Sequence, residues 1–198
     1  MRAALVSVVL SVAFSAAICA GCASPRASFY RLSAEPSLTA TTSLAPGRPL
    51  IVGPVTVPEL VDRPQIVTRD SANQVTLNEY ARWGAPLKSS IADAIAGDLT
   101  LLLGSDRVAV ASRAVADSQA WRVRVDIQQF ESVPGETVVI DAHWTVRSVG
   151  GDTALSGRSV VREPVSGTDF DALVAAHSRA LASVSRDIAA GIGRSAGP

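Results

Sequence analysis

Apolar and polar residues alternate most regularly in the second half of the chain. From Trp121 to Gln128 every second residue is apolar, and a similar run covers 138–147 after the turn at Pro134-Gly135. A third extended run, Leu155 to Arg162, follows Gly150-Gly151. Because successive side chains of a strand point to opposite faces, these runs predict an antiparallel meander with one buried face and one polar face.

Two other segments repeat apolar residues every three or four positions, which is the helical period. The stripe of the segment 86–103 consists of Leu87, Ile91, Ile95, Leu99 and Leu102. Lys88, Asp93 and Asp98 lie off this stripe, Pro86 suits the first turn and Gly104 suits the C-terminal cap. The stripe of the segment 169–192 consists of Phe170, Leu173, Val174, His177, Leu181, Val184, Ile188 and Ile192. Thr168 is expected to cap this second helix and Gly193 to end it.

The first half of the chain holds shorter extended runs. We predict strands over 29–32, 50–57, 65–69, 74–80 and 107–111, and a surface loop over 33–49. Gly53-Pro54 should mark an edge or a bulge, because proline cannot donate to a strand ladder. The pattern therefore predicts an α+β fold, a two-layer sandwich in which a mostly antiparallel, mixed sheet packs against two long amphipathic helices.

The N-terminal segment predicts export. Met1-Arg2 precedes an uncharged apolar run over 3–18, which is typical of a signal peptide and somewhat short for a membrane span of about 20 residues. Cys19-Ala20-Gly21-Cys22 resembles a bacterial lipobox, although Cys19 stands where Leu is usual.

We therefore expect a lipoprotein signal peptide over 1–21, a lipidated Cys22 with a tether over 22–27, and a single domain over 28–198. The modification would be an N-acyl diacylglycerol, and several acyl chains on one residue anchor a protein firmly. The alternative is an ordinary signal peptide cut nearby, which would leave Cys22 as a free thiol.

Composition narrows the classes of function. Hydrophobic residues make up 47% of the chain, which is ample for a core, and 18 basic residues balance 18 acidic ones. A net charge of zero argues against nucleic-acid binding, which normally requires a basic excess. With Cys22 lipidated, the mature chain could form no disulfide, so its stability must rest on its core.

The sequence contains no common catalytic motif. We find no Gly-x-Ser-x-Gly elbow, phosphate-binding loop or His-Glu-x-x-His motif. His177 lies on an apolar helical stripe, which predicts a partly buried structural histidine, and His143 is expected to be inert on the polar face of a strand. The sequence thus indicates a protein that is not an enzyme and that carries no cofactor beyond its lipid.

The carboxylates suggest no metal site. Glu131, Glu136, Asp141 and Asp152 are spread over two strands and their loops. Asp62 and Asp70 flank a segment that holds Arg63 and Arg69, and these alternating charges suggest local pairing.

Three stretches resemble one known family. VGPVTVPELVDRPQIVTR (Val52 to Arg69), NEYARWGAPL (Asn78 to Leu87) and Tyr30-Arg31-Leu32 are similar to the PqiC (YmbA) family of ABC-transporter auxiliary lipoproteins. The similarity runs through the whole mature chain in element order.

This resemblance implies a role in lipid transport between the inner and outer membranes. Family members work with a periplasmic MCE-domain protein (PqiB-like) and a multi-span inner-membrane protein (PqiA-like). The resemblance implies a lipoprotein on the periplasmic face of the outer membrane, which docks the MCE assembly, as a homo-oligomer. Ala23 follows Cys22, which also favours outer-membrane sorting.

Two segments are candidates for partner binding. Asp62, Arg63, Pro64 and Gln65 lie between two predicted strands, and Arg82 and Trp83 precede the first helix. Loops usually present binding residues, and Trp and Arg are enriched where binding energy concentrates. The structural alternative is that Arg63 pairs with a nearby carboxylate and that Trp83 packs into the core.

Two other classes of function share some of these features. An outer-membrane assembly or secretin-pilot lipoprotein would have the same tether and the same lack of chemistry. A periplasmic hydrolase would need a nucleophile and a base that the sequence does not show.

Overall fold

The computed structural model describes residues 25–42, 48–114, 117, 119–148 and 154–195. The predicted signal peptide and Cys22 lie outside these residues. The strands are β1 Ser28–Tyr30, β2 Leu50–Thr56, β3 Gln65–Arg69, β4 Val75–Trp83, β5 Val108–Val110, β6 Trp121–Val133, β7 Thr137–Ser148 and β8 Ala154–Pro164. The helices are the 3-10 turn η1 Glu59–Val61, α2 Leu87–Leu103 and α3 Phe170–Ser195.

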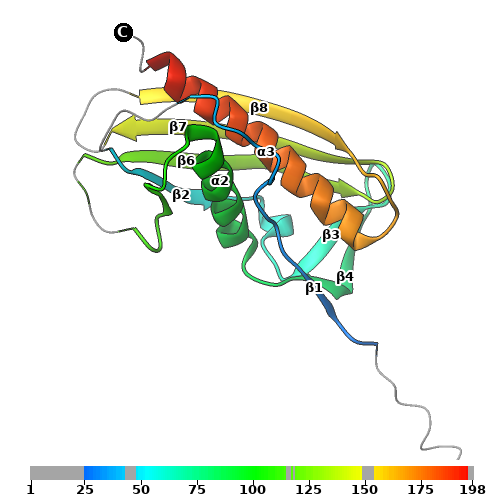
Figure 1. Ribbon diagram of the computed structural model, residues 1–198. Coiled ribbons are helices and arrows are strands. Elements are labelled where there is room, and N and C mark those ends of the chain that lie inside the picture. The colour runs from blue at the N-terminus through cyan, green and yellow to red at the C-terminus, as the bar shows by residue number, and fades with distance from the viewer. Residues whose placement is uncertain (1–24, 43–47, 115–116, 118, 149–153, 196–198) are drawn as a thin grey trace, which may run out of the picture.

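The predicted two-layer α+β sandwich is confirmed. A five-stranded sheet with the order β5-β2-β6-β7-β8 forms one layer, and α2 and α3 lie across one of its faces (Figure 1). Strands β6, β7 and β8 form the predicted antiparallel meander, whereas β2 runs parallel to both β5 and β6. The register of β2 shifts between Val52 and Val55, so Gly53-Pro54 marks a bulge in an interior strand.

The remaining strands form a second sheet, which the sequence did not predict. Its order is β1-β4-β3, with the expected antiparallel pair β3 and β4, and with β1 parallel to β4. Arg69 of β3 forms an ion pair of 3.0 Å with Glu131 of β6, and the neighbouring Val139 is buried. The small sheet therefore covers one end of the face of the large sheet that was expected to be polar.

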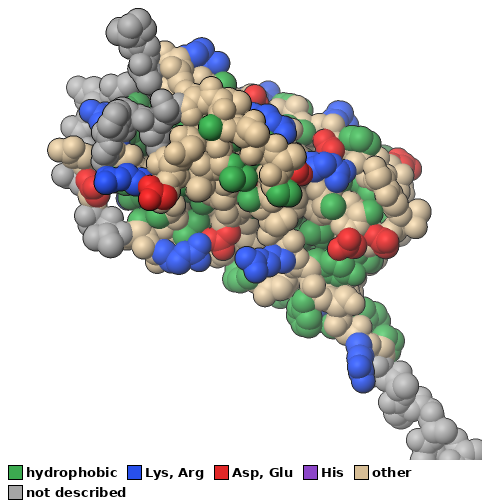
Figure 2. Space-filling view, in the orientation of Figure 1, with side chains coloured by type: hydrophobic (Ala, Val, Ile, Leu, Met, Phe, Trp, Pro, Cys, Tyr) green, Lys and Arg blue, Asp and Glu red, His purple; other side chains and the backbone are tan. Residues whose placement is uncertain are grey.

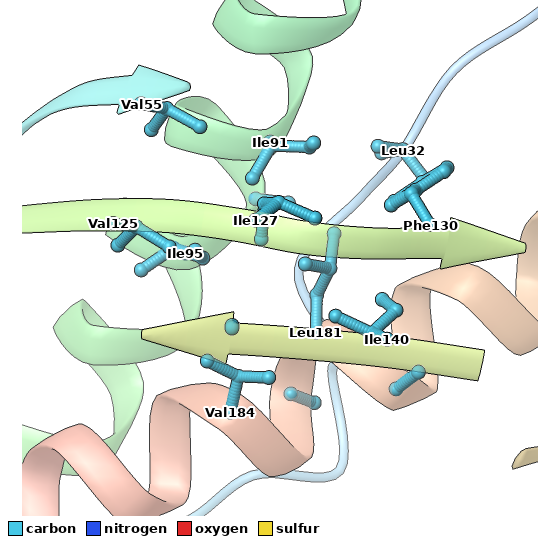
Figure 3. Close-up of a cluster of buried hydrophobic side chains, with 14 of the residues drawn as sticks. Leu32, Val55, Ile91, Ile95, Val125, Ile127, Phe130, Ile140, Leu181 and Val184 are labelled. Atoms are coloured by element: carbon cyan, nitrogen blue, oxygen red, sulfur yellow. The ribbon is translucent and has the colours of Figure 1, made fainter. Parts of the chain in front are cut away.

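Side chains from both layers form one core. Figure 3 shows Leu32, Val55, Ile91, Ile95, Val125, Ile127, Phe130, Ile140, Leu181 and Val184 packed together. The predicted stripe of α2 is buried, and Gly104 caps this helix in the left-handed conformation. Burying apolar surface on this scale is the main force that stabilises the fold.

The ends of α3 differ from the prediction. The side chain of Asp169, not that of Thr168, caps the helix by accepting a hydrogen bond of 2.7 Å from the Ala172 N–H. The helix also continues past Gly193 to Ser195. A glycine costs a helix only about 1 kcal/mol, which is too little to end one that is packed along its length.

Trp144 holds α3 against the large sheet. A Cβ on Gly157 of β8 would clash with its ring, and one on Gly191 of α3 would lie 2.8 Å from it, so both positions require glycine. The Trp144 Nε1–H donates to Ser159 Oγ over 3.2 Å, and the Ser159 hydroxyl donates to Asp187 of α3 over 2.6 Å. This packing fixes the C-terminal half of α3 on β7 and β8.

Candidate functional site

A pocket of about 400 Å³ lies where the small sheet meets the start of α2. It is lined by Asp62, Arg63, Pro64, Trp83, Ala85, Pro86 and Leu87. The structure thus brings together four of the residues that the sequence marked as candidates for partner binding. Ala85, Pro86 and Leu87 were assigned only to the start of the helix, although their position next to Trp83 could have indicated them.

Gln65 and Arg82 do not line the pocket. They face each other across β3 and β4, and both contact Glu79 on the surface. The Arg82 guanidinium forms an ion pair of 3.0 Å with Glu79. Strand alternation explains the separation, because Arg82 and Trp83 are neighbours in β4 and point to opposite faces.

Short backbone hydrogen bonds fix the walls of the pocket. The Arg63 N–H donates to Val61 O over 2.8 Å at the end of η1, and the Trp83 N–H donates to Pro64 O over 2.7 Å. The second bond joins two segments that are far apart in the sequence. Pro64 and Pro86 each lack a backbone donor and have a restricted φ, which stiffens the two rims further.

Arg63 provides the charge of the pocket. Asp62 forms an ion pair of 2.7 Å with Lys88 of α2, whereas Arg63 makes no ion pair with any residue that the structure describes. Its Nε is buried and has no hydrogen-bond acceptor. A buried donor without an acceptor is costly, so a carboxylate entering the pocket would be a favourable partner.

The predicted local pairing of charges in this segment is wrong. Asp62 pairs with Lys88, Arg69 pairs with Glu131, and Asp70 accepts a hydrogen bond of 2.6 Å from Thr76. The fold brings these partners from other elements, which the order of charges along the chain does not record.

Trp83 packs inward and closes the bottom of the pocket. Only 5% of its surface is exposed, and its ring lies edge-on to Phe130 at 6.3 Å and to His177 at 6.2 Å. Trp83 therefore packs into the core, as the structural alternative predicted. Of Arg63 and Trp83, Arg63 is the residue that remains available to a ligand.

His177 is fully buried rather than partly buried. Its ring stacks on Phe130 at 4.1 Å, and its Nε2 lies 2.8 Å from Ser132 Oγ. Burial lowers the pKa of His177 to about 3, so the ring is neutral at physiological pH. The pair of Ser and His resembles part of a catalytic site, but Ser132 is also buried, and no described residue hydrogen-bonds to His177 Nδ1 to orient the ring.

The other candidates for chemistry include two neighbouring positions of β7. His143 is exposed on β7, and the neighbouring Asp141 accepts hydrogen bonds of 2.9 and 2.7 Å from Arg158. These hydrogen bonds lower the pKa of Asp141. Among the described residues no group of three or more His, Cys, Asp or Glu could hold a metal ion.

Comparison with known families decides the class of this protein. A family model described as "ABC-type transport auxiliary lipoprotein component" matches residues 30–189. The chain belongs to this family. The match spans every strand from β2 to β8, all of α2, most of α3 and every residue of the pocket, and it identifies the protein as an auxiliary lipoprotein of ABC-type transport.

Two solved structures share the fold of this auxiliary lipoprotein. An uncharacterised protein superposes with a TM-score of 0.69 and 21% identity, over 85% of this chain and 99% of its own. Protein XCC0632 from Xanthomonas campestris, a DUF330 protein, superposes with a TM-score of 0.57 and 20% identity, over 86% of this chain and 96% of its own. No curated protein matches the sequence.

Within the described residues, neither α2 nor α3 combines the length and apolar character that a bilayer crossing requires.

Proposed function

We propose that this auxiliary lipoprotein is anchored in the outer membrane through Cys22 and docks a periplasmic MCE-domain protein of the PqiB type. It would act without chemistry of its own, as a homo-oligomer, in a lipid-transport system that also contains a PqiA-like inner-membrane protein. The observation that carries the proposal is Arg63, a half-buried guanidinium that pairs with no carboxylate among the described residues, on the wall of a pocket.

The pocket suits a protein segment that carries an acidic group. Its floor and rims are formed by Trp83, Pro64, Pro86 and Leu87, which offer apolar contact, and Arg63 offers a guanidinium that could bind a carboxylate in bidentate fashion. The hydrogen bonds at Val61 and Pro64 hold the walls in place, so binding would cost little ordering of the site.

A docking role also fits the position of the buried polar groups. Ser132 and His177 lie beneath Trp83 and are closed to solvent, so they stabilise the floor of the pocket rather than face a substrate. Arg63, in contrast, is half-exposed at the surface of the domain. Its contribution should therefore be to binding energy and not to the stability of the fold.

Arg63→Glu should abolish the co-purification of the MCE protein while the domain stays folded. The change puts a carboxylate where the partner's carboxylate is expected, and losing a charge-assisted contact should weaken binding at least about tenfold. Arg63 donates no side-chain hydrogen bond within the described residues, so the melting temperature should stay within a few degrees.

Arg124→Glu is the matched control, since Arg124 is an exposed arginine on β6 away from the pocket. This variant should keep the partner. An Arg63→Glu chain that is stable and still retains the MCE protein would refute the docking role of the pocket. Retention of a secretin instead of an MCE protein by the wild-type chain would favour the pilot-lipoprotein alternative.

A further inference from the structure

Exposed aromatic residues gather where the N-terminal segment meets the domain. Phe29 of β1 is 68% exposed and Tyr80 of β4 is 52% exposed, the largest exposures of any aromatic side chains in the described residues. Figure 2 shows hydrophobic side chains on the surface around this point. A single exposed aromatic residue is common, but neighbouring exposed apolar side chains can mark a contact surface.

Strand pairing places Phe29 and Arg82 on one outer face. In the parallel pair of β1 and β4, Phe29 lies opposite Arg82 and Tyr30 lies opposite Trp83. Tyr30 packs on Phe170 at 5.8 Å and Trp83 is buried, so this pair faces the core and Phe29 and Arg82 face outward. Tyr80 precedes Arg82 by two residues in β4, where the pairing with β3 is irregular, and its side chain is exposed beside this face.

The charge on this outer face is balanced. Arg82 and Glu79 form an ion pair of 3.0 Å, and both side chains remain accessible to solvent. A surface with two aromatic rings beside a balanced ion pair resembles the composition of the membrane interface, where aromatic rings lie at the level of the headgroups. It offers no charge excess that would select an oppositely charged protein.

The length of the chain determines what can cover this face. Six residue steps separate Cys22 from Ser28, and an extended chain spans about 3.3–3.6 Å per residue, which sets a limit of about 20 Å. A lipid anchor at Cys22 would therefore hold β1, and with it Phe29, close to the membrane surface. The bilayer is the one surface that is always within reach of this face.

We propose that the outer face of the small sheet, formed by Phe29, Tyr80 and Arg82, rests in the headgroup region of the membrane. The inference depends on the proposed anchor at Cys22 and goes beyond it, because it assigns the domain a second, non-covalent lipid contact. Two contacts fix the orientation of the domain, whereas one point of attachment would leave it free to rotate. The pocket at Arg63 would then point in a constant direction toward the partner.

Spin labels on the mature, lipidated chain can test this contact, because acylated Cys22 is its sole native cysteine. Phe29→Cys and Tyr80→Cys each leave the other ring in place. Val160→Cys is the matched control, since Val160 of β8 is 57% exposed on the large sheet. The labelled proteins are placed in vesicles of phosphatidylethanolamine and phosphatidylglycerol, and collisions with oxygen and with a water-soluble nickel complex are compared.

The ratio of oxygen to nickel accessibility should be several-fold higher at positions 29 and 80 than at position 160. Equal ratios in vesicle-bound protein would overturn the lipid contact and leave the anchor intact. Spin–spin broadening at position 80 that disappears on dilution with unlabelled protein would show a second copy on this face, which also overturns the contact. Protein that fails to float with the vesicles would refute the anchor at Cys22, and this inference with it.

Discussion

A Cys22→Ala chain should keep its signal peptide and carry no lipid at all. Lipid attachment to the cysteine sulfur precedes cleavage in lipoprotein processing, so a chain without this thiol should accumulate as a larger precursor. Each buried CH₂ of an acyl chain adds about 0.8 kcal/mol to membrane binding, and several chains together hold a protein firmly. The loss of all of them is therefore the largest single change expected for this protein.

The mass of the purified protein checks this prediction, and globomycin treatment of the wild type should produce the same larger species. Cys19→Ala is the matched control, because the bulky Ile18 before it makes Cys19 a poor acceptor. This variant should be lipidated and cleaved normally. A Cys22→Ala protein that is cleaved and released in soluble form would show that the segment is an ordinary signal peptide.

The spacing of apolar residues along the chain predicted two long strands and the two long helices. The alternation over 121–128 and 138–147 located β6 and β7, and the stripes of the two long helices located α2 and α3. The division of the strands into two sheets was not predictable in this way. It depends on the parallel pairing of β1 with β4, which joins Phe29 to Arg82, and no local pattern specifies a pairing between such distant segments.

The sequence predicted several residues of the candidate site, but not which of them lie together. Arg63 and Trp83 were chosen because of their residue types, and the structure places both at one pocket. Gln65 and Arg82 were chosen for the same reason, yet they lie on another face, because a strand that runs to Trp83 alternates its side chains. Residue type thus indicated where binding could occur, and only the backbone decided which side chains meet.

Asp98 is a second residue whose surroundings the sequence pattern did not predict. The sequence places it off the apolar stripe of α2, where an exposed carboxylate is expected. In the structure its side chain is fully buried between α2, α3 and the segment after β1. Its two oxygens accept hydrogen bonds of 2.8 Å from the Glu35 N–H and 2.9 Å from the Ser185 hydroxyl. Tertiary packing around a second helix covers a position that the pattern of a single helix would leave in water.

Burial raises the pKa of Asp98 from 3.8 to about 6, because the ionised form loses its hydration. The folded state therefore holds this proton more tightly than the unfolded state does. The resulting stability is fully present below about pH 4 and is lost as the pH rises through about 6. This rise in the pKa of Asp98 corresponds to a change in the free energy of unfolding on the order of 2–3 kcal/mol.

His177 has the opposite effect. Its pKa falls from 6.5 to about 3 in the folded state, so the unfolded chain binds a proton first as the pH drops. Its contribution to stability is present above about pH 6.5 and is lost on acidification toward pH 3. Between about pH 4 and 6 the two groups therefore change the free energy of unfolding in opposite directions. The wild-type stability should be nearly constant over this interval as far as these two groups determine it.

Asp98→Asn should remove the pH dependence that comes from Asp98 and leave the one that comes from His177. The Asn oxygen can accept the hydrogen bond from the Glu35 N–H, and its amide can donate to Ser185 Oγ, whose own proton can go to Leu181 O. The variant should be more stable than the wild type at pH 8 by on the order of 2–3 kcal/mol, since it buries no charge there. Below pH 6 its stability should fall by about 1.4 kcal/mol per pH unit, because the slope from His177 is no longer opposed.

Urea unfolding at a series of pH values from 4 to 8 measures both effects. Asp93→Asn is the matched control, because Asp93 lies on the same helix with its side chain 43% exposed, and it should follow the wild-type curve. If Asp98→Asn were less stable than the wild type at pH 8, the ionised carboxylate would be stabilising the junction of α2, α3 and the segment after β1. The hydrogen bonds from Glu35 and Ser185 would then outweigh the loss of hydration, and the charge on Asp98 would be part of what holds the N-terminal segment to the domain.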